Sequence, residues 1–521
     1  MATPEEKLAE SLVELEKLQN KRGIAIIKAD DLSRTHKERL IKNGFIREII
    51  KGWYISCPSD EKQGETTSWY VSFWNFIASY IDSRFGKDWC LSPEHSLSLH
   101  SGNFMVPTQL LIRSPKASNN RVNLLHGSSV FDSKVEIPQQ NEREDIEGVQ
   151  VYSLEAGLVA VSSDFYRRHP TDARTCLAMV KDSSGVLAKL LDGGKSLVAG
   201  RLSGAFRNIG NDKIANSILG TMKSAGYDVR ETDPFNEKME LELSSREVSP
   251  YVNRIKIMWE QMRGVVIKYF PDAPKEILKV NDYLKQVQEN YRSDAYHSLS
   301  IEGYQVTPEL IEKVASGDWD PNKSVEDRQQ KDAMAARGYF QAFQDVKASI
   351  KSVLEDENPG EVVDNDHGSW YRELFAPSVA VGLAKASDLA GYRNGPVYMK
   401  GAMHTPPRHE AVRDTMPVLF DLLKGEPEAS VRVVLGHFIF VYIHPYFDGN
   451  GRMARFLMNV MLASGNYPWT IIKMDKRAQY MSALEKASVG NDITDFAKFI
   501  GEQVSNTIAG KSGNIYPVFA P

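Results

Sequence analysis

A polar loop between two apolar helical stretches is the sequence feature that most constrains this chain. Residues 429–443 and 453–463 are both predicted to be helices from the spacing of their apolar residues. Between them, residues 444–455 contain a histidine, an aspartate, a Gly-Asn-Gly sequence and two arginines. The sequence therefore predicts a helix, a loop that carries polar chemistry, and a second helix.

The composition is typical of a soluble globular protein. The chain has 521 residues, a formal net charge of −5, 42% apolar and 25% charged residues, which excludes a disordered chain, a collagen-like repeat and a disulfide-stapled miniprotein. At roughly 100–200 residues per domain, the length indicates about three domains. Cys57, Cys90 and Cys176 lie far apart in no metal-binding pattern, so we expect free thiols.

We expect the cytoplasm as the compartment. Residues 1–18 are acidic and amphipathic, unlike a signal peptide. The most apolar stretch, residues 433–443, is far shorter than the ~20 residues of a membrane span, so no membrane partner is expected.

We predict a multi-domain, mainly α-helical chain. It comprises a winged helix-turn-helix at residues 1–60, an α+β domain at 61–245 and a helical domain at 246–521 with an N-terminal helical extension; a charged, proline-flanked segment marks the boundary near 245. In the middle region, 68–85 and 186–227 are predicted to be helical and 109–113 and 149–152 to be strands. Further helices are predicted at 251–270, 274–291, 325–354, 378–390, 415–423 and 476–487.

Residues 17–51 are strongly basic, with ten Lys or Arg against four Asp or Glu. Residues 9–18 and 32–43 are predicted helices, the second opening with Ser33, and 45–50 and 53–55 are the strands of a predicted hairpin. This order is typical of a winged helix-turn-helix, in which Arg34, His36 or Lys37 would face a DNA groove and Lys51 a phosphate. The alternative is a solvated basic face on a protein-binding domain.

The hairpin also resembles the winged-helix start of AbiEi-type antitoxin and transcription-regulator proteins. The resemblance rests on Gly-Phe-Ile-Arg at 44–47 followed by Lys-Gly-Trp-Tyr at 51–54. It extends loosely over residues 61–245, where it implies a sensor or scaffold role.

The loop after residue 443 has the residue types of a phosphate site. Gly449, Asn450 and Gly451 open a helix, so backbone N–H groups and the helix dipole can bind an anion there. Arg452 and Arg455 are three residues apart on one helix face and can reach successive phosphates of a nucleotide.

Two further residues of the loop supply different chemistry. Asp448 offers a carboxylate to a magnesium ion that also binds phosphates. His444 can accept a proton from an attacking hydroxyl. A base, a metal ligand, an anion loop and two arginines within twelve residues together favour a functional phosphate site.

Residues 444–455 resemble the signature of Fic-domain proteins, His-Pro-Phe-x-Asp/Glu-Gly-Asn-Gly-Arg-x-x-Arg, within a likeness that spans about residues 290–505. The likeness implies an all-helical Fic domain that transfers AMP from ATP, with Mg²⁺, to a Ser, Thr or Tyr hydroxyl of a target protein and of itself. By this likeness His444 is the base, Asp448 the magnesium ligand, Gly449, Asn450, Gly451 and Arg452 the anion hole for the α- and β-phosphates, and Arg455 the partner of the γ-phosphate.

Two positions depart from the Fic pattern. Tyr446 replaces the usual Phe; its ring is expected to anchor the loop in the core, and its hydroxyl needs a partner. Tyr480 and Met481 stand where the family often has paired aromatic residues around the adenine, which leaves the choice of base open.

A second segment resembles the inhibitory pattern of the same family, Ser/Thr-x-x-x-Glu-Gly/Asn. Ser298, Glu302 and Gly303 match it. The likeness implies that the Glu302 carboxylate pairs with Arg455 and so takes the arginine that the γ-phosphate needs.

The family's target-docking flap is a third likeness. Val397, Tyr398 and Met399, which follow Gly-Tyr-Arg at 391–393, resemble this flap. By the likeness they would hold an extended segment of the target protein beside the site.

Other functions stay open. One is removal of AMP from a modified target, and another is a different Fic transfer, of UMP, phosphate or phosphocholine. The alternative of another class is a DNA-binding regulator or antitoxin-like protein whose Fic domain senses a nucleotide. A homo-oligomer is also open.

Overall fold

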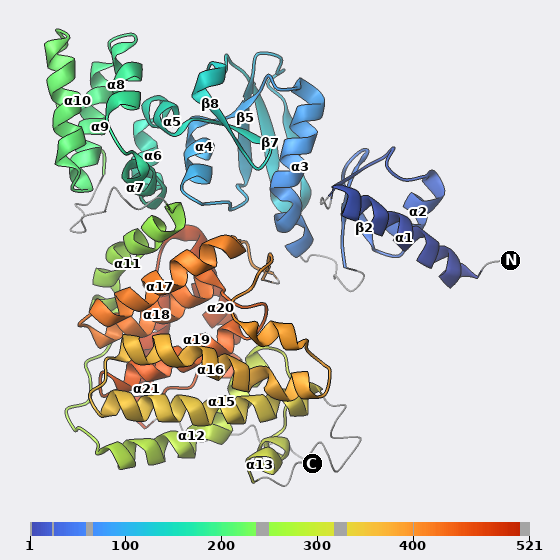
Figure 1. The fold of residues 1–521 in the computed structure, drawn as a ribbon, viewed down its shortest axis with the longest axis vertical. Helices are drawn as coiled ribbons and strands as arrows, with labels where there is room; N and C mark the ends of the chain where they lie inside the picture. The colour runs from blue at the N-terminus through green and yellow to red at the C-terminus, as the bar shows by residue number, and fades with distance from the viewer. Residues whose placement is uncertain are drawn as a thin grey trace. The chain divides into compact units, whose positions relative to one another are not determined.

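A computed structural model describes residues 3–22, 26–58, 66–235, 249–316, 331–399 and 401–510 (Figure 1). The chain divides into two compact units, one of residues 1–254 and 398–405 and the other of residues 255–397 and 406–521. The predicted domain boundaries at 60/61 and 245/246 both lie outside the described residues, so the three-domain division stays a prediction.

The first unit starts with a small helix-and-sheet region. Its elements are α1 (Pro4–Arg22), β1 (Ile26–Lys28), α2 (Arg34–Lys42), β2 (Ile46–Ile50) and β3 (Trp53–Ser56), with the antiparallel sheet order β1-β3-β2. Ser33 caps α2 by accepting a hydrogen bond from the N–H of His36, and Gly52 at the hairpin turn has φ +84°. The predicted helices and hairpin are present, but β1 separates the two helices, and the winged helix-turn-helix stays a prediction.

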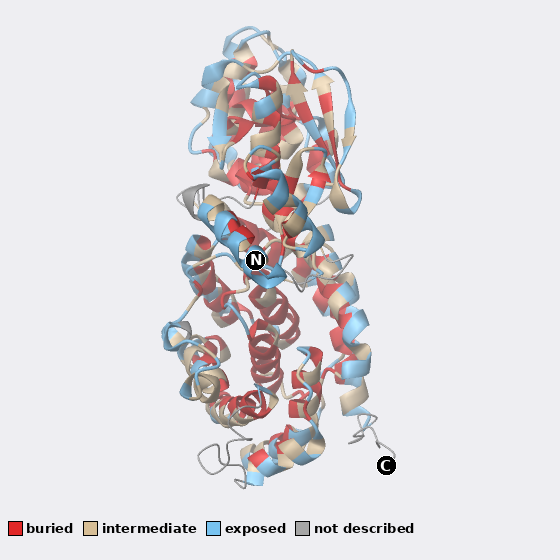
Figure 2. Cartoon of the chain, turned by 90° about the vertical axis from the view of Figure 1, so that its right-hand side faces the viewer, coloured by how far each residue is buried: buried red, intermediate tan, exposed pale blue. Residues whose placement is uncertain are grey.

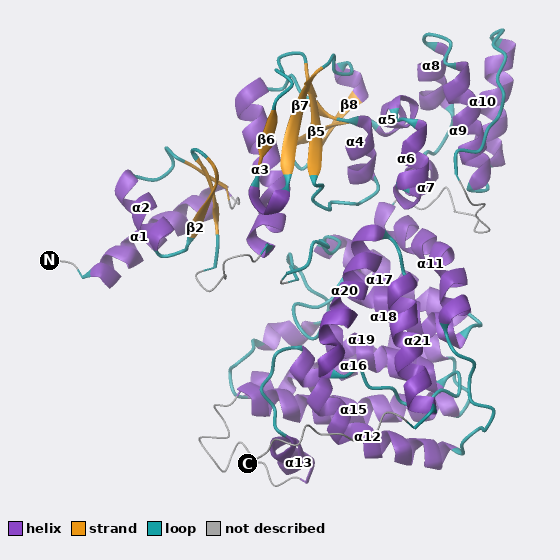
Figure 3. Cartoon of the chain, turned by 180° about the vertical axis from the view of Figure 1, so that it is seen from behind, coloured by secondary structure: helices purple, strands orange, loops and turns teal. Residues whose placement is uncertain are grey.

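The rest of this unit mixes strands and helices (Figure 3). The strands are β4 (Cys90–Leu91), β5 (Gln109–Ser114), β6 (Arg121–Asn123), β7 (Ser129–Lys134), β8 (Arg143–Ile146) and β9 (Val149–Tyr152). They form a sheet of order β4-β5-β7-β6, in which β5 and β7 are parallel, and a β8-β9 hairpin. The strands expected at 109–113 and 149–152 are therefore confirmed, and the mixed α+β content agrees with the prediction.

The helices of this region are α3 (Thr67–Phe85), α4 (Pro93–His100), α5 (Leu154–Ala160), α6 (Ser163–Arg168), α7 (Pro170–Met179), α8 (Ser184–Leu191), α9 (Ser196–Asn208) and α10 (Asp212–Ser224), with 3₁₀ turns at Leu125–Gly127 and Gln140–Glu142. Helix α3 and the helices from α8 to α10 fall in the ranges expected to be helical, and the helices from α4 to α7 were not expected. In α3 the side chains of Trp69, Phe73 and Phe76 are fully buried, so its aromatic face belongs to the core of the unit.

The C-terminal half is helical. Its helices are α11 (Pro250–Tyr269), α12 (Val280–Ile301), α13 (Pro308–Ser316), α15 (Lys331–Leu354), α16 (Pro359–Ala380), α17 (His409–Gly425), α18 (Ala429–Ile443), α19 (Asn450–Ala463), α20 (Arg477–Gly490) and α21 (Thr494–Ile508), with 3₁₀ turns at Ala386–Ala390 and Met474–Lys476. The bounds of α18 match the prediction.

Some predicted helices of this half are wrong in position. The helix expected at 274–291 starts at Val280; Ile277 fits the apolar spacing but is 81% exposed, so it belongs to no buried face. The helix expected at 378–390 does not exist as such, because α16 ends at Ala380 and Gly382 follows with φ +77°. Helices α13, α16 and α21 were not expected. The start expected at 325 lies outside the described residues.

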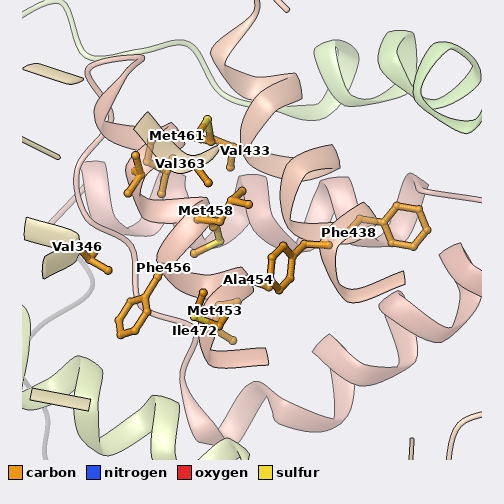
Figure 4. Close-up of a cluster of buried hydrophobic side chains, with 14 of the residues drawn as sticks. Val346, Val363, Val433, Phe438, Met453, Ala454, Phe456, Met458, Met461 and Ile472 are labelled. Atoms are coloured by element: carbon orange, nitrogen blue, oxygen red, sulfur yellow. The ribbon is translucent and has the colours of Figure 1, made fainter. Parts of the chain in front are cut away.

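Helices α18 and α19 are the most deeply buried pair of the second unit. Figure 2 colours the buried residues of the chain red. Every residue of α18 except Ala429 and Val441 is buried, and so is every residue of α19 except Gly451. Figure 4 shows Val433, Ala454 and Met458 of these helices in the hydrophobic core. A helix that is apolar on all sides needs cover on all sides, which explains why the other helices pack around this pair. No described helix is long and apolar enough to cross a bilayer.

Burial of α18 predicts a large loss of stability for one truncation. Leu435→Ala removes a fully buried side chain and is expected to lower the free energy of unfolding by about 2–5 kcal/mol. Chemical denaturation followed by intrinsic fluorescence measures it. Leu197→Ala, at a side chain that is 91% exposed, is the matched control and is expected to change stability by less than about 0.5 kcal/mol. Equal effects at the two positions would contradict the burial of α18.

Candidate active site

The loop between α18 and α19 begins and ends with left-handed residues. His444, the C-cap of α18, has φ 53° and ψ 61°, and Gly449, the N-cap of α19, has φ 82° and ψ 0°. Asn450 fixes the loop, since its side chain accepts a hydrogen bond from the N–H of Tyr446 at 2.9 Å and donates one to the carbonyl of Tyr446 at 2.8 Å. The side chain of Asn450 therefore holds the loop. Of Asn450, only the backbone N–H remains for the anion-binding role expected of this residue.

Tyr446 anchors this loop in the core. Its side chain is 2% exposed, and its ring stacks on Tyr371 with the centroids 3.7 Å apart and the planes at 8°. Burial raises the pKa of the Tyr446 hydroxyl above its ordinary value, so the hydroxyl stays protonated. The ring has the position expected of the aromatic residue after Pro445.

The first turn of α19 is suited to an anion. Its N-cap, Gly449, has no side chain that could bond the first N–H groups of the helix, and the helix dipole adds positive potential there. A Cβ atom on Gly451 would lie 2.3 Å from Oε1 of Glu302. The Glu302 carboxylate therefore already lies over the turn where an anion is expected.

Arg455 is the partner of this carboxylate. Its Nη2 lies 2.7 Å from Oε1 of Glu302, and its side chain is only 3% exposed. Ser298 supplies two more acceptors: its Oγ accepts from Nε at 2.8 Å and its carbonyl from Nη2 at 3.1 Å. Ser298 and Glu302 are four residues apart, so both meet the guanidinium from one side of α12. The contact expected between Glu302 and Arg455 is thus present.

The end of α12 is held in place by its neighbours. The helix ends at Ile301, Glu302 is its C-cap, and Gly303 follows with φ +91°. Nε of Arg477 donates to the carbonyl of Ile301 at 2.8 Å. Beyond the helix, the N–H of Gln305 donates to Oδ1 of Asp332 at 3.2 Å. The Glu302 carboxylate is therefore attached to a fixed piece of backbone.

A pocket of about 310 Å³ opens beside this segment. Its lining residues are Glu302, Gly303, Tyr304, Gln305, Lys331, Asp332 and Asp448. The pocket thus joins the segment after α12 to the loop before α19.

Arg452 has a different environment from Arg455. Its side chain is fully buried, and its guanidinium lies 5.2 Å from the ring centroid of Tyr304 and 5.0 Å from that of Phe375. Nη2 also lies 3.4 Å from Oδ1 of Asp448. Two ring faces and a carboxylate therefore stabilise this buried charge. The sequence interpretation missed Tyr304 and Phe375, because neither stands in a recognisable pattern with Arg452.

His444 is held as a neutral imidazole. The pKa of His444 is lowered to about 4, mainly by burial. The positive charge of Arg393 adds to the lowering, while the hydrogen bond to Val441 and the carboxylates of Glu302 and Asp448 act in the opposite direction. Nδ1 lies 3.3 Å from the carbonyl of Val441. A neutral ring must donate at this contact, which leaves Nε2 as the basic nitrogen.

Asp448 fits a magnesium ligand. Its side chain is 61% exposed, and its contacts with the N–H of Gly449 and with Arg452 both use Oδ1. Among the described residues no group of three or more His, Cys, Asp or Glu could hold a metal ion. Magnesium that binds substrate phosphates needs only one or two protein carboxylates, so a single exposed aspartate beside the anion site suits it.

Tyr480 lies in a buried polar network. Its hydroxyl is 2.7 Å from Nε2 of His437, and its side chain is 1% exposed. Burial, and after it the charge of Arg455, lower the pKa of His437 to about 3, so this imidazole is neutral. The association of Tyr480 with the adenine base stays a prediction.

The predicted flap lies where the chain passes from one unit to the other. Val397 belongs to the second unit and Tyr398 and Met399 to the first, and none of the three lies in a helix or strand. Their docking role stays a prediction.

The predicted DNA contacts have unequal surroundings. Arg34 is 88% exposed and pairs with Glu38 at 2.7 Å, and Lys51 is exposed at the hairpin turn. His36 contacts Ser11 of α1 through Nδ1 at 2.9 Å. Nζ of Lys37 lies 5.8 Å from the ring centroid of Tyr54. Arg34 and Lys51 are therefore the two with the freest access to solvent.

Comparison with known proteins identifies the domain that carries the loop. Residues 368–462 match the Fic/DOC family model. "Protein adenylyltransferase Fic" of Nematostella vectensis is 28% identical over 241 residues, covering 45% of this chain and 52% of that protein. "Protein adenylyltransferase fic-1" of Caenorhabditis elegans is 26% identical over 232 residues, covering 43% and 42%. The chain therefore contains a Fic/DOC domain and spans about half the length of the curated relatives it matches.

Two solved structures are also similar. One is a Fic domain containing signaling protein from Bacteroides thetaiotaomicron, with 16% identity, coverage of 50% of this chain and 94% of that chain, and a TM-score of 0.34. The other is Fic-1 (residues 134–508) from C. elegans, with 17% identity, coverage of 66% and 92%, and a TM-score of 0.37.

The surroundings of His444 predict an unusual titration. Its ring is expected to gain a proton only near pH 4 and to stay neutral from about pH 5 upward, because burial penalises the charged form. Side-chain NMR across pH 3–8 measures this, with the signal assigned from its loss in His444→Ala. A midpoint near the ordinary value of about 6.5 would contradict the buried environment.

Proposed function

We propose that this protein transfers AMP from ATP to a Ser, Thr or Tyr hydroxyl of a target protein and of itself. The Fic/DOC domain and the relatives named adenylyltransferase support the proposal. The observation that carries it is the Glu302 carboxylate over the first turn of α19 and against Arg455. The chain's own anion lies where the phosphates of a nucleotide would bind.

The loop residues supply the parts that such a transfer needs. The acceptor hydroxyl gives its proton to Nε2 of His444 while its oxygen attacks the α-phosphorus. The bond from the α-phosphorus to the bridging oxygen breaks, and pyrophosphate leaves. The amides at the start of α19 and Arg452 stabilise the charge that develops on the phosphate oxygens, and Arg455 orients the γ-phosphate. Asp448 would hold a magnesium ion, which neutralises phosphate charge when bound.

Glu302 gives the same site an off state. A carboxylate paired with Arg455 competes with the γ-phosphate for one guanidinium. ATP then binds without the contact that aligns its α-phosphorus with the acceptor. Release of Glu302 from Arg455 is therefore the activating step.

This off state predicts activation by one substitution. Glu302→Gly is expected to raise self-modification by about 10-fold or more, because a hydrogen bond to a charged group is worth about 1.5–3 kcal/mol. Incorporation of label from α-labelled ATP measures it. Glu357→Gly, which alters an exposed loop glutamate, is the matched control and is expected to match the wild-type protein.

Three further arms complete the experiment. Adding His444→Ala to Glu302→Gly is expected to abolish incorporation, because no base remains. Wild-type incorporation equal to that of Glu302→Gly would contradict inhibition. Net release of AMP from a pre-labelled protein by the wild type would favour the de-AMPylase alternative, and label from UTP alone would favour another nucleotidyl transfer.

DNA binding through the N-terminal region is a second candidate function, favoured by the exposed Arg34 and Lys51 within a locally basic segment. Binding to duplex DNA is expected to weaken steeply between 50 and 200 mM salt, because each phosphate contact releases counterions. Fluorescence anisotropy with labelled duplex measures this. Arg34→Ala with Lys51→Ala should flatten the salt dependence, and an absence of binding at low salt would exclude this function.

A further inference from the structure

Arg393 is a buried arginine that contacts the backbone on both sides of the catalytic histidine. Its side chain is 1% exposed. Nε donates to the carbonyl of His444 at 2.8 Å, Nη2 to that of Ile443 at 3.3 Å, and the backbone N–H of Arg393 donates to the carbonyl of Pro445 at 2.9 Å. The carbonyls of three consecutive residues therefore all accept hydrogen bonds from Arg393.

The same guanidinium also holds two points farther along the chain. Nη1 donates to the carbonyl of Gly395 at 3.1 Å, and Nη2 donates to the carbonyl of Pro407. Gly395 and Pro407 flank residues 396–406, which include the segment predicted to dock a target. Both ends of that segment are thus attached to the side chain that holds the backbone of His444.

We propose that Arg393 is a positioning residue for AMP transfer, which holds the backbone of His444 and closes the two ends of segment 396–406 around one guanidinium. The inference rests on the proposed function and assigns a role to a residue outside the Gly-Asn-Gly loop. Arg393 acts through His444 and through this segment, without touching the nucleotide.

The backbone at His444 requires such support. A non-glycine residue at φ 53° is strained and persists only where its surroundings fix it. The last carbonyls of α18 have no partner within the helix, and the negative end of the helix dipole favours a cation there. A guanidinium carries five donors in a rigid plane, so it can satisfy several carbonyls at once.

Precise placement of His444 matters to the reaction. The acceptor oxygen must lie close to the α-phosphorus while its proton reaches Nε2, and a shift of about 1 Å costs roughly 100-fold in rate. Besides Arg393, the charged groups that act on His444 are Glu302 and Asp448. Loss of the Arg393 charge removes one of the causes that lower the pKa of His444 and therefore favours the protonated ring.

The test uses the full chain in the Glu302→Gly background. Arg393→Lys keeps the charge but cannot span the carbonyls, and Arg393→Gln also removes the charge; Arg413→Lys, at an exposed position of α17, is the matched control. Self-modification at saturating ATP is expected to fall about 10-fold or more in Arg393→Lys. ATP affinity by calorimetry is expected to change less than about twofold, since Arg452 and Arg455 are intact. A rate equal to that of the control, or a parallel loss of rate and ATP affinity, would overturn the proposal.

A second measurement does not depend on transfer activity. The titration midpoint of His444 by NMR is expected to rise in Arg393→Gln and to change less in Arg393→Lys. An unchanged midpoint in Arg393→Gln would overturn the role of Arg393 even if Glu302→Gly itself transferred no AMP, a result that would refute the proposed function separately. Loss of cooperative thermal unfolding in both variants would make Arg393 a stability residue and would also overturn the proposal.

Discussion

Two arginines on the most buried helix of the second unit are the constraint on which the site depends. Arg452 and Arg455 carry positive charge into a helix that lies in a largely apolar core. A buried charge is tolerated only with partners. Here Ser298 and Glu302 serve Arg455, while Tyr304 and Phe375 cover Arg452. The segment from the end of α12 to Tyr304 therefore contributes to both arrangements, which connects the proposed regulation of the site to the stability of its core.

Much of the site could be predicted from the sequence because its residues are close in the chain. The bounds of α18 and the polar loop after it follow from a short apolar run and the polar and glycine residues that end it. The contact between Glu302 and Arg455 could be expected although 153 residues separate them, because each stands in a recognisable pattern. These predictions rest on residues that are close in sequence and on resemblance to a family's motifs.

Contacts that depend on the tertiary fold and match no sequence motif could not be predicted in this way. Phe375 lies on α16, a helix whose Gly and Asp residues and Pro377 hide its apolar spacing. Arg393 stands in an irregular segment and acts on backbone carbonyls, which carry no sequence signal. Asn450 is a similar case. Its place in the Gly-Asn-Gly loop predicts contact with a bound anion, whereas its side chain bonds to the backbone of Tyr446. Such roles depend on tertiary structure.

The missing side chain of Gly451 has a consequence for how the proposed enzyme would respond to its nucleotide. The carboxylate of Glu302 lies in the space where a Cβ atom would stand, so a phosphate that bound there would have to displace it. A carboxylate on the same chain acts at a fixed effective concentration, independent of how much protein is present. The nucleotide level at which phosphate replaces it would then be set by how firmly Arg477 and Asp332 hold the end of α12. The nucleotide concentration needed for activation would then depend on the stability of the C-terminal end of α12.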